Sequence, residues 1–264
     1  HDDMQLVAQI QQTLDSDGFD LLAQPITSLS DDDNKPRYEI LLRMKDNEGG
    51  QIASSALISA AERYQMMPQI DRWVISNTLA KIAASPSVIE DLGAEFSINL
   101  SGQSLSDDDI LQFIVEEIQE AGLPATSLGF EVTESAAVSN LSKAQKFITS
   151  LREHGCRIAL DDFGAGLSSF AYLKNFAVDI LKIDGGFIRD ITDNRISESM
   201  VAAITQVAKV MDLVTVAEYV ESEKTRRLIT ELGVDFAQGH AIGKPVPLNG
   251  VLAELTDRTR ESTA

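Results

Sequence analysis

The chain has 264 residues, of which 44% are hydrophobic and 24% are charged, so it can bury a substantial core without disulfides or structural metals. The excess of 41 acidic over 22 basic residues gives a net charge of −19, which excludes DNA and other long polyanions as expected partners. The single cysteine, Cys156, excludes an internal disulfide, and no apolar run is long enough to span a membrane. We therefore expect a cytoplasmic protein or the cytoplasmic domain of a membrane-anchored protein, with Cys156 as buried packing.

Short apolar runs that are typical of strands recur along the whole chain. The eight candidates are Leu21–Gln24, Tyr38–Leu42, Phe96–Asn99, Gly129–Val132, Arg157–Leu160, Ile180–Ile183, Val214–Ala217 and Asp235–Gln238. The stretch Asp31–Pro36 between the first two candidates predicts a surface turn. Because no helix separates these two strands, we expect them to be antiparallel neighbours.

Amphipathic patterns between the later runs predict helices over Pro68–Ala84, Ser139–His154 and Ser197–Met211. In the second helix we expect Ser139 to cap the start and Gly155 to stop the end. Trp73, in the first helix, is expected in the core. Alternating strands and helices favour an α/β fold, a TIM-like (β/α)8 barrel whose first strand is antiparallel to the rest, with a doubly wound open sheet as the alternative.

Polar side chains recur where the apolar strands end. They are Glu39, Asn99, Glu131, Asp161, Asp162, Lys182, Asp184, Glu218 and Gln238. A carboxylate in such a place often caps a helix or faces water, which is the favoured interpretation of Glu134 and Glu221 taken alone. In a barrel, however, these strand ends converge on one mouth. Several carboxylates there must take up protons or bind cations, and oxygen ligands without Cys or His favour Mg²⁺ or Mn²⁺.

The segment Asp161-Asp162-Phe163-Gly164-Ala165-Gly166 adds two adjacent aspartates at one strand end. Adjacent carboxylates can serve two metal ions that clamp a phosphoryl displacement. A protein kinase is excluded because no glycine-rich loop and no His-Arg-Asp catalytic loop accompany the Asp-Phe-Gly triplet. Lys182 is either a buried base, an electrostatic anchor for an attacking water, or a snorkelling side chain.

These motifs together resemble the EAL domain, the bacterial phosphodiesterase that linearises cyclic di-GMP, from about Phe19 to Pro247. The matching segments are Gln24-Pro25-Ile26, Glu39-Ile40-Leu41-Leu42-Arg43, Asn99-Leu100-Ser101, Glu131-Val132-Thr133-Glu134, Asp161–Gly166, Lys182-Ile183-Asp184, Ala217-Glu218 with Val220-Glu221, and Gln238-Gly239 with Gly243-Lys244-Pro245. The resemblance implies one such domain over residues 1–264, as a module of a longer signalling protein.

The resemblance also implies a role for each matched residue. The metal ligands would be Glu39, Asn99, Glu131, Asp161, Asp162 and Glu218, with Asp161 shared between two ions. Lys182 would hold the attacking water, and Glu39 and Glu218 would be the other catalytic residues. Glu134 would brace the loop after Asp162. The dinucleotide groove would be lined by Gln24, Leu42, Arg43, Asp184, Gln238 and Pro245.

The implied reaction is the attack of a metal-activated water on one phosphodiester of cyclic di-GMP, which yields linear pGpG. The implied cofactors are two Mg²⁺ or Mn²⁺ ions, with Ca²⁺ inhibitory. The implied partners are a second copy of the chain and a fused N-terminal sensor or GGDEF domain. The homodimer surface would include the helix Ser197–Met211 and the segment Phe163–Leu173.

Three residues depart from the family signature. Ile40 stands where the signature has alanine, and we expect it to point away from Glu39 and to be tolerated. Tyr219 stands where glycine is usual, which would be costly if the position requires a positive φ and would put the placement of Glu218 in doubt. His240 stands where tyrosine is common, and it either stacks on a base or faces solvent.

Two alternatives remain open. A receptor that binds cyclic di-GMP without turnover would share the fold, although such receptors typically lose metal ligands or the lysine, and all of these are retained here. A metal-dependent barrel enzyme that acts on carboxylate substrates, as in the enolase superfamily, is disfavoured by Gln24, Arg43 and the Asp-Asp-Phe-Gly loop.

Overall fold

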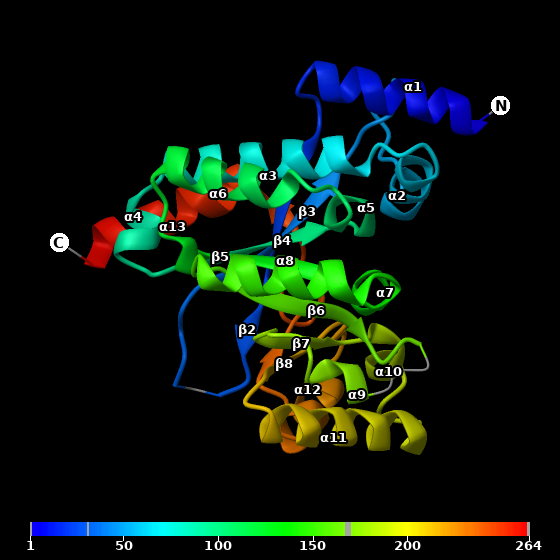
Figure 1. Ribbon diagram of the computed structural model, residues 1–264. Coiled ribbons are helices and arrows are strands. Elements are labelled where there is room, and N and C mark those ends of the chain that lie inside the picture. The colour runs from blue at the N-terminus through cyan, green and yellow to red at the C-terminus, as the bar shows by residue number, and fades with distance from the viewer. Residues whose placement is uncertain (1, 31, 167–169, 263–264) are drawn as a thin grey trace.

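The fold is α/β, with a curled, mostly parallel sheet that forms a TIM-like barrel (Figure 1). The computed structural model describes residues 2–30, 32–166 and 170–262. Its strands are β1 (Asp20–Pro25), β2 (Thr27–Ser28), β3 (Arg37–Arg43), β4 (Glu95–Leu100), β5 (Leu128–Thr133), β6 (Arg157–Phe163), β7 (Ile180–Ile183), β8 (Val214–Ala217), β9 (Phe236–Ala237) and β10 (Val246–Pro247).

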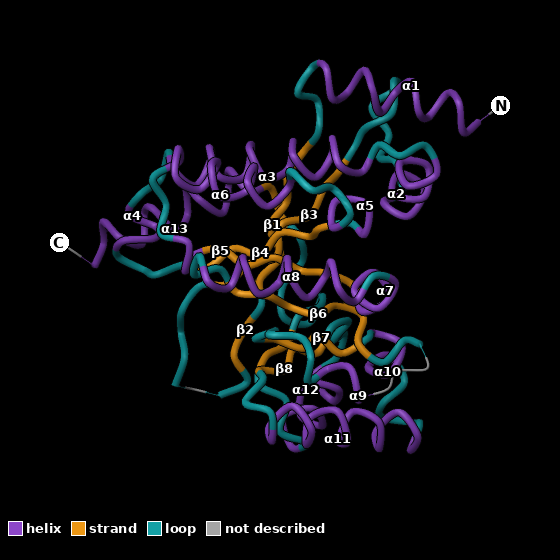
Figure 2. Tube along the Cα trace, viewed as in Figure 1, coloured by secondary structure: helices purple, strands orange, loops and turns teal. Residues whose placement is uncertain are grey.

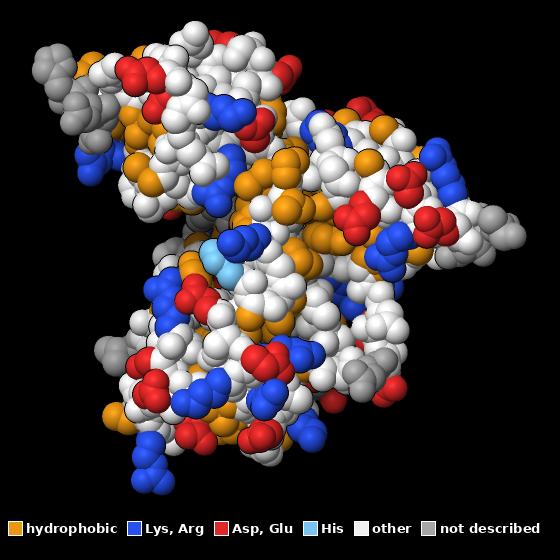
Figure 3. All heavy atoms as spheres, turned by 180° about the vertical axis from the view of Figure 1, so that it is seen from behind, with side chains coloured by type: hydrophobic (Ala, Val, Ile, Leu, Met, Phe, Trp, Pro, Cys, Tyr) orange, Lys and Arg blue, Asp and Glu red, His pale blue; other side chains and the backbone are white. Residues whose placement is uncertain are grey.

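Helices cover the outer face of this sheet (Figure 2). They are α1 (Asp2–Asp15), α2 (Ser54–Arg63), α3 (Met67–Ala83), α4 (Ser87–Glu90), α5 (Gly102–Leu105), α6 (Ile110–Ala121), α7 (Glu134–Ser139), α8 (Leu141–Glu153), α9 (Phe170–Leu173), α10 (Gly185–Arg189), α11 (Arg195–Val210), α12 (Glu223–Glu231) and α13 (Leu248–Ser262). No described helix combines the length and the apolar character that a membrane crossing requires. On the face opposite to that of Figure 1, acidic and basic side chains are intermixed (Figure 3).

The strand order is β10-β1-β3-β4-β5-β6-β7-β8-β9-β2. Strands β3 to β9 are parallel neighbours, whereas β1 is antiparallel to β3, with Leu22 opposite Leu41. The predicted antiparallel first pair is therefore confirmed. Two strands were not predicted, because β2 and β10 have only two residues each and leave no periodic signal.

Alternation along the strands separates an outer apolar face from an inner polar one. In β7 the neighbours Leu181 and Ile183 are buried in the apolar core, and Lys182 between them is 1% exposed and belongs to the interior of the barrel. Successive side chains of a strand point to opposite faces, so the apolar residues pack under the helices while the polar ones converge. This alternation directs the functional side chains into the interior of the barrel.

The structure corrects the predicted start of the helix over Ser139–His154. Ser139 ends the short helix α7, and the Asn140 side chain caps α8 by accepting a hydrogen bond from the Lys143 N–H. Trp73 also differs from prediction, since it is half-buried and its indole N–H donates to Asp17 Oδ1 at 2.8 Å. A tryptophan at the edge of a core satisfies its polar atom in this way.

Cys156 lies just before β6 and is 2% exposed, as predicted. Burial raises the pKa of its thiol to about 12.

The thiolate is the reactive form of Cys156, so the folded protein should react with a disulfide reagent at pH 8 at least about tenfold more slowly than the urea-unfolded chain. Equal rates in the two states, followed by absorbance of the released thiolate, would contradict this burial.

Candidate active site

A single buried lysine forms the centre of the barrel mouth. Lys182 Nζ lies 2.5 Å from Glu131 Oε2, 3.0 Å from Glu39 Oε2, 3.1 Å from Glu218 Oε1 and 3.7 Å from Asp161 Oδ1. Glu39, Glu131 and Asp161 come from strands β3, β5 and β6, and Glu218 directly follows β8. The predicted convergence of strand-end residues on one mouth is therefore present in the structure.

Neutral side chains donate hydrogen bonds to Glu39 and Glu131, which are 5% and 2% exposed. Asn99 Nδ2 donates to Glu39 Oε1 at 2.7 Å, Gln238 Nε2 donates to Glu39 Oε2 at 2.6 Å, and the Ser97 hydroxyl donates to Glu131. Each buried oxygen of Glu39 thus has a donor, which offsets part of the cost of burying its charge.

The same glutamine joins the two ends of the curled sheet. Gln238, which follows β9, also donates to Gln24 Oε1 of β1 at 3.1 Å, and Gln24 Nε2 donates in turn to the Gly243 carbonyl at 3.1 Å. Strands β9 and β1 are not paired with each other in the strand order of the described residues, so this side-chain link contributes to closing the barrel.

Burial and mutual charge set the protonation of these groups. Burial alone lowers the pKa of Lys182, but the charges of Asp161, Glu131, Glu218 and Glu39 outweigh it and hold that pKa well above its usual value. These carboxylates therefore favour the charged form of Lys182 in the metal-free cluster. Among the interpretations of this residue, the electrostatic anchor fits this ionisation and the neutral buried base does not.

The carboxylates respond differently to the same surroundings. Burial raises the pKa of Glu39, but Lys182 and the hydrogen bonds from Asn99 and Gln238 overcome this effect and lower it below its usual value. Burial and the charge of Glu39 raise the pKa of Glu131 to about 8. Burial likewise raises the pKa of Glu218 well above its usual value, and it raises that of Asp162, with help from Asp161, to about 6. One ammonium cannot neutralise the whole cluster.

Three of the carboxylates form a group of suitable size for a metal ion. Asp161, Asp162 and Glu218 each offer an oxygen, and these oxygens lie within 4.8 Å of one another. Glu218 Oε2 is buried and has no hydrogen-bond partner in the described chain. A hard divalent cation fits this donor set, because its ligands would all be carboxylate oxygens and its charge would offset the excess of negative charge.

The backbone after β6 is shaped to hold both aspartates. Asp162 has a φ of +52°, and its N–H donates to the Asp161 side chain at 2.9 Å. Two residues on, the Gly164 N–H donates to Glu134 Oε2 at 2.9 Å, so Glu134 braces this loop from α7. The segment Phe163–Leu173 continues into residues 167–169, which lie outside the described part of the chain.

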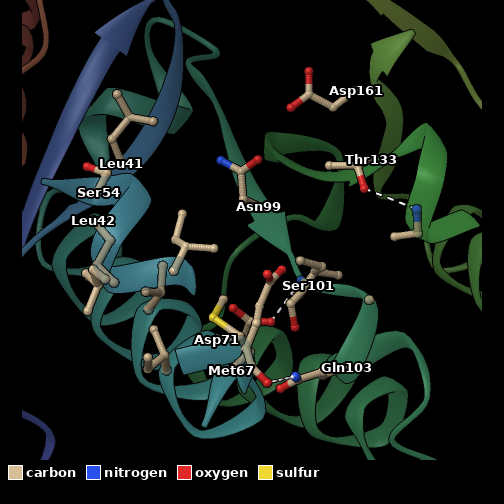
Figure 4. A pocket seen from close by; sticks show the side chains of 18 of the residues that line it. Leu41, Leu42, Ser54, Met67, Asp71, Asn99, Ser101, Gln103, Thr133 and Asp161 are labelled. Carbon is tan, nitrogen blue, oxygen red and sulfur yellow. Dashed lines mark hydrogen bonds between the residues drawn. The ribbon is translucent and has the colours of Figure 1, made fainter. Parts of the chain in front are cut away.

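A cavity of about 660 Å³ opens beside the carboxylates, between β3, α2, α3 and α5 (Figure 4). Asn99 and Asp161 lie at its edge, and Leu42 and Ser54 line one side. Arg43 also lines it and donates from its guanidinium to the Ser54 hydroxyl at 3.0 Å. The lining combines apolar side chains with polar and charged ones, so the cavity offers both apolar contact and hydrogen bonds to a ligand.

Asp71 lines the same cavity, although no motif in the sequence marks it. It is 4% exposed, and its carboxylate accepts hydrogen bonds from the Ser101 N–H at 2.9 Å and the Ser104 hydroxyl at 2.6 Å. Burial raises its pKa. The only sequence signal is an acidic residue on the apolar face of α3, next to Ile70.

The remaining predicted residues lie around this centre. Asp184 caps α10 by accepting from the Gly186 N–H at 2.8 Å, and Pro245 is half-buried just before β10, outside the lining of the large cavity. Ile40 is buried in the apolar core, and His240 is exposed. Tyr219 has a φ of +55°, so the position does adopt the positive φ that would be costly for tyrosine, yet Glu218 still lies 3.1 Å from Lys182.

Sequence and structure comparisons match this geometry to one family. The profile of the EAL domain family matches residues 7–245. The chain belongs to the EAL domain family. It is 39% identical over 261 residues to the cyclic di-GMP phosphodiesterase PdeF of Escherichia coli, which covers 99% of this chain and 34% of PdeF.

Other relatives agree. The cyclic di-GMP phosphodiesterase PdeB of Shewanella oneidensis is 35% identical over 95% of this chain and 29% of its own length. The structure of the PaMucR phosphodiesterase in complex with c-di-GMP has a TM-score of 0.87 and 28% identity, and covers 94% of this chain and 99% of that one. The EAL chain spans about a third of the length of these two curated relatives.

The charge balance predicts how loss of the lysine affects stability. In a metal-free Lys182→Met variant, the remaining buried carboxylates lose their counter-charge, which should cost about 3–5 kcal/mol of unfolding free energy at pH 8. Their pKa values rise in the folded variant, so the stability they contribute is present at low pH and is lost as pH rises. Urea unfolding with a chelator should therefore show a smaller loss at pH 5.

The exposed Lys146 of α8 provides the control. A Lys146→Met variant should unfold within about 0.5 kcal/mol of the parent at both pH values. If the Lys182→Met deficit were the same at pH 5 and pH 8, the lysine would not be the counter-charge of this cluster.

Proposed function

We propose that this EAL domain hydrolyses cyclic di-GMP to linear pGpG by attack of water on one phosphodiester. The observation that carries the proposal is the set of four carboxylates around Lys182, with Asp162 next to two of them and a cavity of about 660 Å³ beside the cluster. The relatives PdeF and PdeB are named cyclic di-GMP phosphodiesterases, and the PaMucR structure contains c-di-GMP, which supports this substrate.

The residues of the mouth have different proposed roles in the reaction. We assign Asp161, Asp162 and Glu218 to divalent cations, with Glu39, Asn99 and Glu131 as further ligands, and we propose two Mg²⁺ or Mn²⁺ ions with Ca²⁺ as an inhibitor. When bound, these cations would lower the pKa of the attacking water and offset the charge that builds on the phosphate. Lys182 keeps its protons and orients that water by donating a hydrogen bond.

The proton balance uses the carboxylates. As the water oxygen attacks phosphorus, the proton of the water passes to Glu218, a carboxylate with a raised pKa. The bond from phosphorus to the leaving ribose oxygen breaks at the same time, and that oxygen takes up a proton from solvent. Glu218 Oε2 is buried and lacks a partner in the described chain, so it is available to hold the water by accepting a hydrogen bond. Glu39 keeps Lys182 in place through its 3.0 Å contact.

The groove residues would hold the dinucleotide. Arg43 and Leu42 both line the cavity, and we assign Arg43 to a phosphate and Leu42 to contact with a base. Gln24, Gln238 and Pro245 lie toward the β1 side of the mouth, and Asp184 lies at the start of α10. A concave site of this kind holds a flat base by contact with its apolar side chains and uses its polar groups for orientation.

The direct test is turnover. Purified protein with Mg²⁺ or Mn²⁺ should convert cyclic di-GMP to pGpG, as followed by chromatography of the nucleotides. Lys182→Ala and Glu39→Ala should each reduce the rate by at least about 10³-fold, because each removes charge or support that acts on the reacting water. The exposed-site variant Lys146→Ala should keep the parental rate.

The alternative is a receptor that binds cyclic di-GMP without hydrolysing it. The specific observation in its favour is the positive φ of Tyr219, which adjoins Glu218 and stores strain at the site. Calorimetric binding of the dinucleotide with no pGpG formed under either metal would establish the receptor and contradict the phosphodiesterase.

We also propose that the domain acts as a homodimer and as one module of a longer signalling protein with a sensor or GGDEF domain. Helix α11 carries exposed apolar side chains, with Ile196 75% exposed and Met200 36% exposed. Such side chains on one helix favour a protein contact.

Substitution on α11 tests the dimer. Light scattering of the parent should show dimers at micromolar concentration, and Met200→Glu should shift them to monomers by placing a charge in the contact. The matched control is Met4→Glu on α1, where Met4 is 73% exposed. Monomers of the parent at all concentrations tested would contradict the dimer.

A further inference from the structure

Tyr219 lies between a functional carboxylate and a rigid loop. Its φ of +55° is in the left-handed region, which is unfavourable for a bulky residue. Glu218 precedes it and contacts Lys182 at 3.1 Å, whereas Val220 follows it and is 0% exposed. The backbone of residue 219 therefore sets the direction in which Glu218 points.

The far side of this turn is fixed by backbone contacts. The Val220 N–H donates to the Gln238 carbonyl at 3.0 Å, and the Ala241 N–H donates to the Val220 carbonyl at 3.0 Å. A Cβ on Gly239 would lie 2.3 Å from Val220 N, so the two loops touch through their backbones. Because Val220 is held in this way, any adjustment of Glu218 must be absorbed at Tyr219.

The Tyr219 ring is held on the other side by α10. Its centroid lies 4.0 Å from the Arg189 guanidinium carbon, a cation–π contact. The ring also lies on Gly185, where an added Cβ would be only 2.0 Å from Tyr219 Cδ2. Helix α10 follows β7, the strand that carries Lys182, so the ring connects the Glu218 backbone to the segment that leaves the Lys182 strand.

We infer that the Tyr219–Arg189 stack is a positioning element that keeps the Glu218 carboxylate directed at Lys182 and at Asp161 and Asp162. The stack compensates for the unfavourable backbone that a glycine would have avoided. Its effect should be on the affinity of the Asp161–Asp162–Glu218 group for a divalent cation. The inference rests on the proposed function only in taking this group as the cation site.

The test measures cation binding directly, apart from turnover. Mn²⁺ would be titrated calorimetrically into metal-free protein carrying Tyr219→Asn, which tolerates a positive φ but lacks the ring, or Arg189→Gln, which lacks the charge. Each should weaken Mn²⁺ binding about three- to fivefold, the effect of losing a partly exposed cation–π contact. The double variant should be no weaker than the single ones, because both remove the same stack.

Matched variants separate the stack from a general effect on folding. Tyr219→Phe and Arg189→Lys retain a ring and a cation, and both should bind Mn²⁺ as the parent does. With cyclic di-GMP, Tyr219→Asn should regain the parental kcat at high Mn²⁺ while its Mn²⁺ midpoint stays raised. Because Mn²⁺ binding also stabilises the folded state, urea unfolding without metal should show each variant fully folded under the titration conditions, so that weaker binding is not a loss of folded protein.

The outcomes separate a failure of the positioning role from a failure of the proposed function. If the parent binds Mn²⁺ and Tyr219→Asn binds it equally or more tightly, the positioning role is wrong and the proposed function stands. If the parent does not bind Mn²⁺ at all, the assignment of the carboxylates to a cation fails, and the proposed function fails with it.

Discussion

The site depends on an imbalance of charge, because one buried ammonium faces five carboxylates. Lys182 contacts Glu39, Glu131, Asp161 and Glu218, and Asp162 lies beside them. Without further cations, Glu131, Asp162 and Glu218 hold their protons to a higher pH than usual, as their raised pKa values indicate, whereas the pKa of Glu39 is lowered. With divalent cations the same carboxylates can ionise together, so the imbalance is what prepares the site for metal.

The fold brings these charges together from distant parts of the chain. Glu39, Glu131 and Asp161 lie within strands and Glu218 follows one, and the period of two in a strand turns these side chains inward while their neighbours pack under helices. The parallel order of β3 to β9 brings the strand ends to one mouth. The Gln24–Gln238 hydrogen bond then links the first strand to the last large loop.

Much of this arrangement is predictable from sequence because it depends on period and order. The strand ends, the inward position of Lys182 and the antiparallel β1–β3 pair all follow from local patterns. Other features depend on contacts between segments far apart in sequence, and local patterns do not contain them. Asp71 enters the cavity because α3 packs beside α5, and β10 forms because β1 offers an unpaired edge.

Tyr219 has one feature that the sequence predicts and one that it does not. Its residue type alone indicates that a glycine position is occupied by a bulky side chain, and the φ of +55° bears that out. Its compensation does not follow from the sequence, since the stack on Arg189 requires knowing that α10 lies beside the end of β8. Helix boundaries were limited in the same way, because Asn140 separates α7 from α8 where the apolar pattern is continuous.

The most direct measurement of the central claim is thermal unfolding of the metal-free protein with and without Mn²⁺. If the carboxylate excess is a cation site, saturating Mn²⁺ should raise the unfolding midpoint by several degrees, through about 2–3 kcal/mol of binding linkage, and an Asp161→Asn variant should lose most of that increase. An unchanged midpoint in the parent, or an equal increase in Asp161→Asn, would contradict the account.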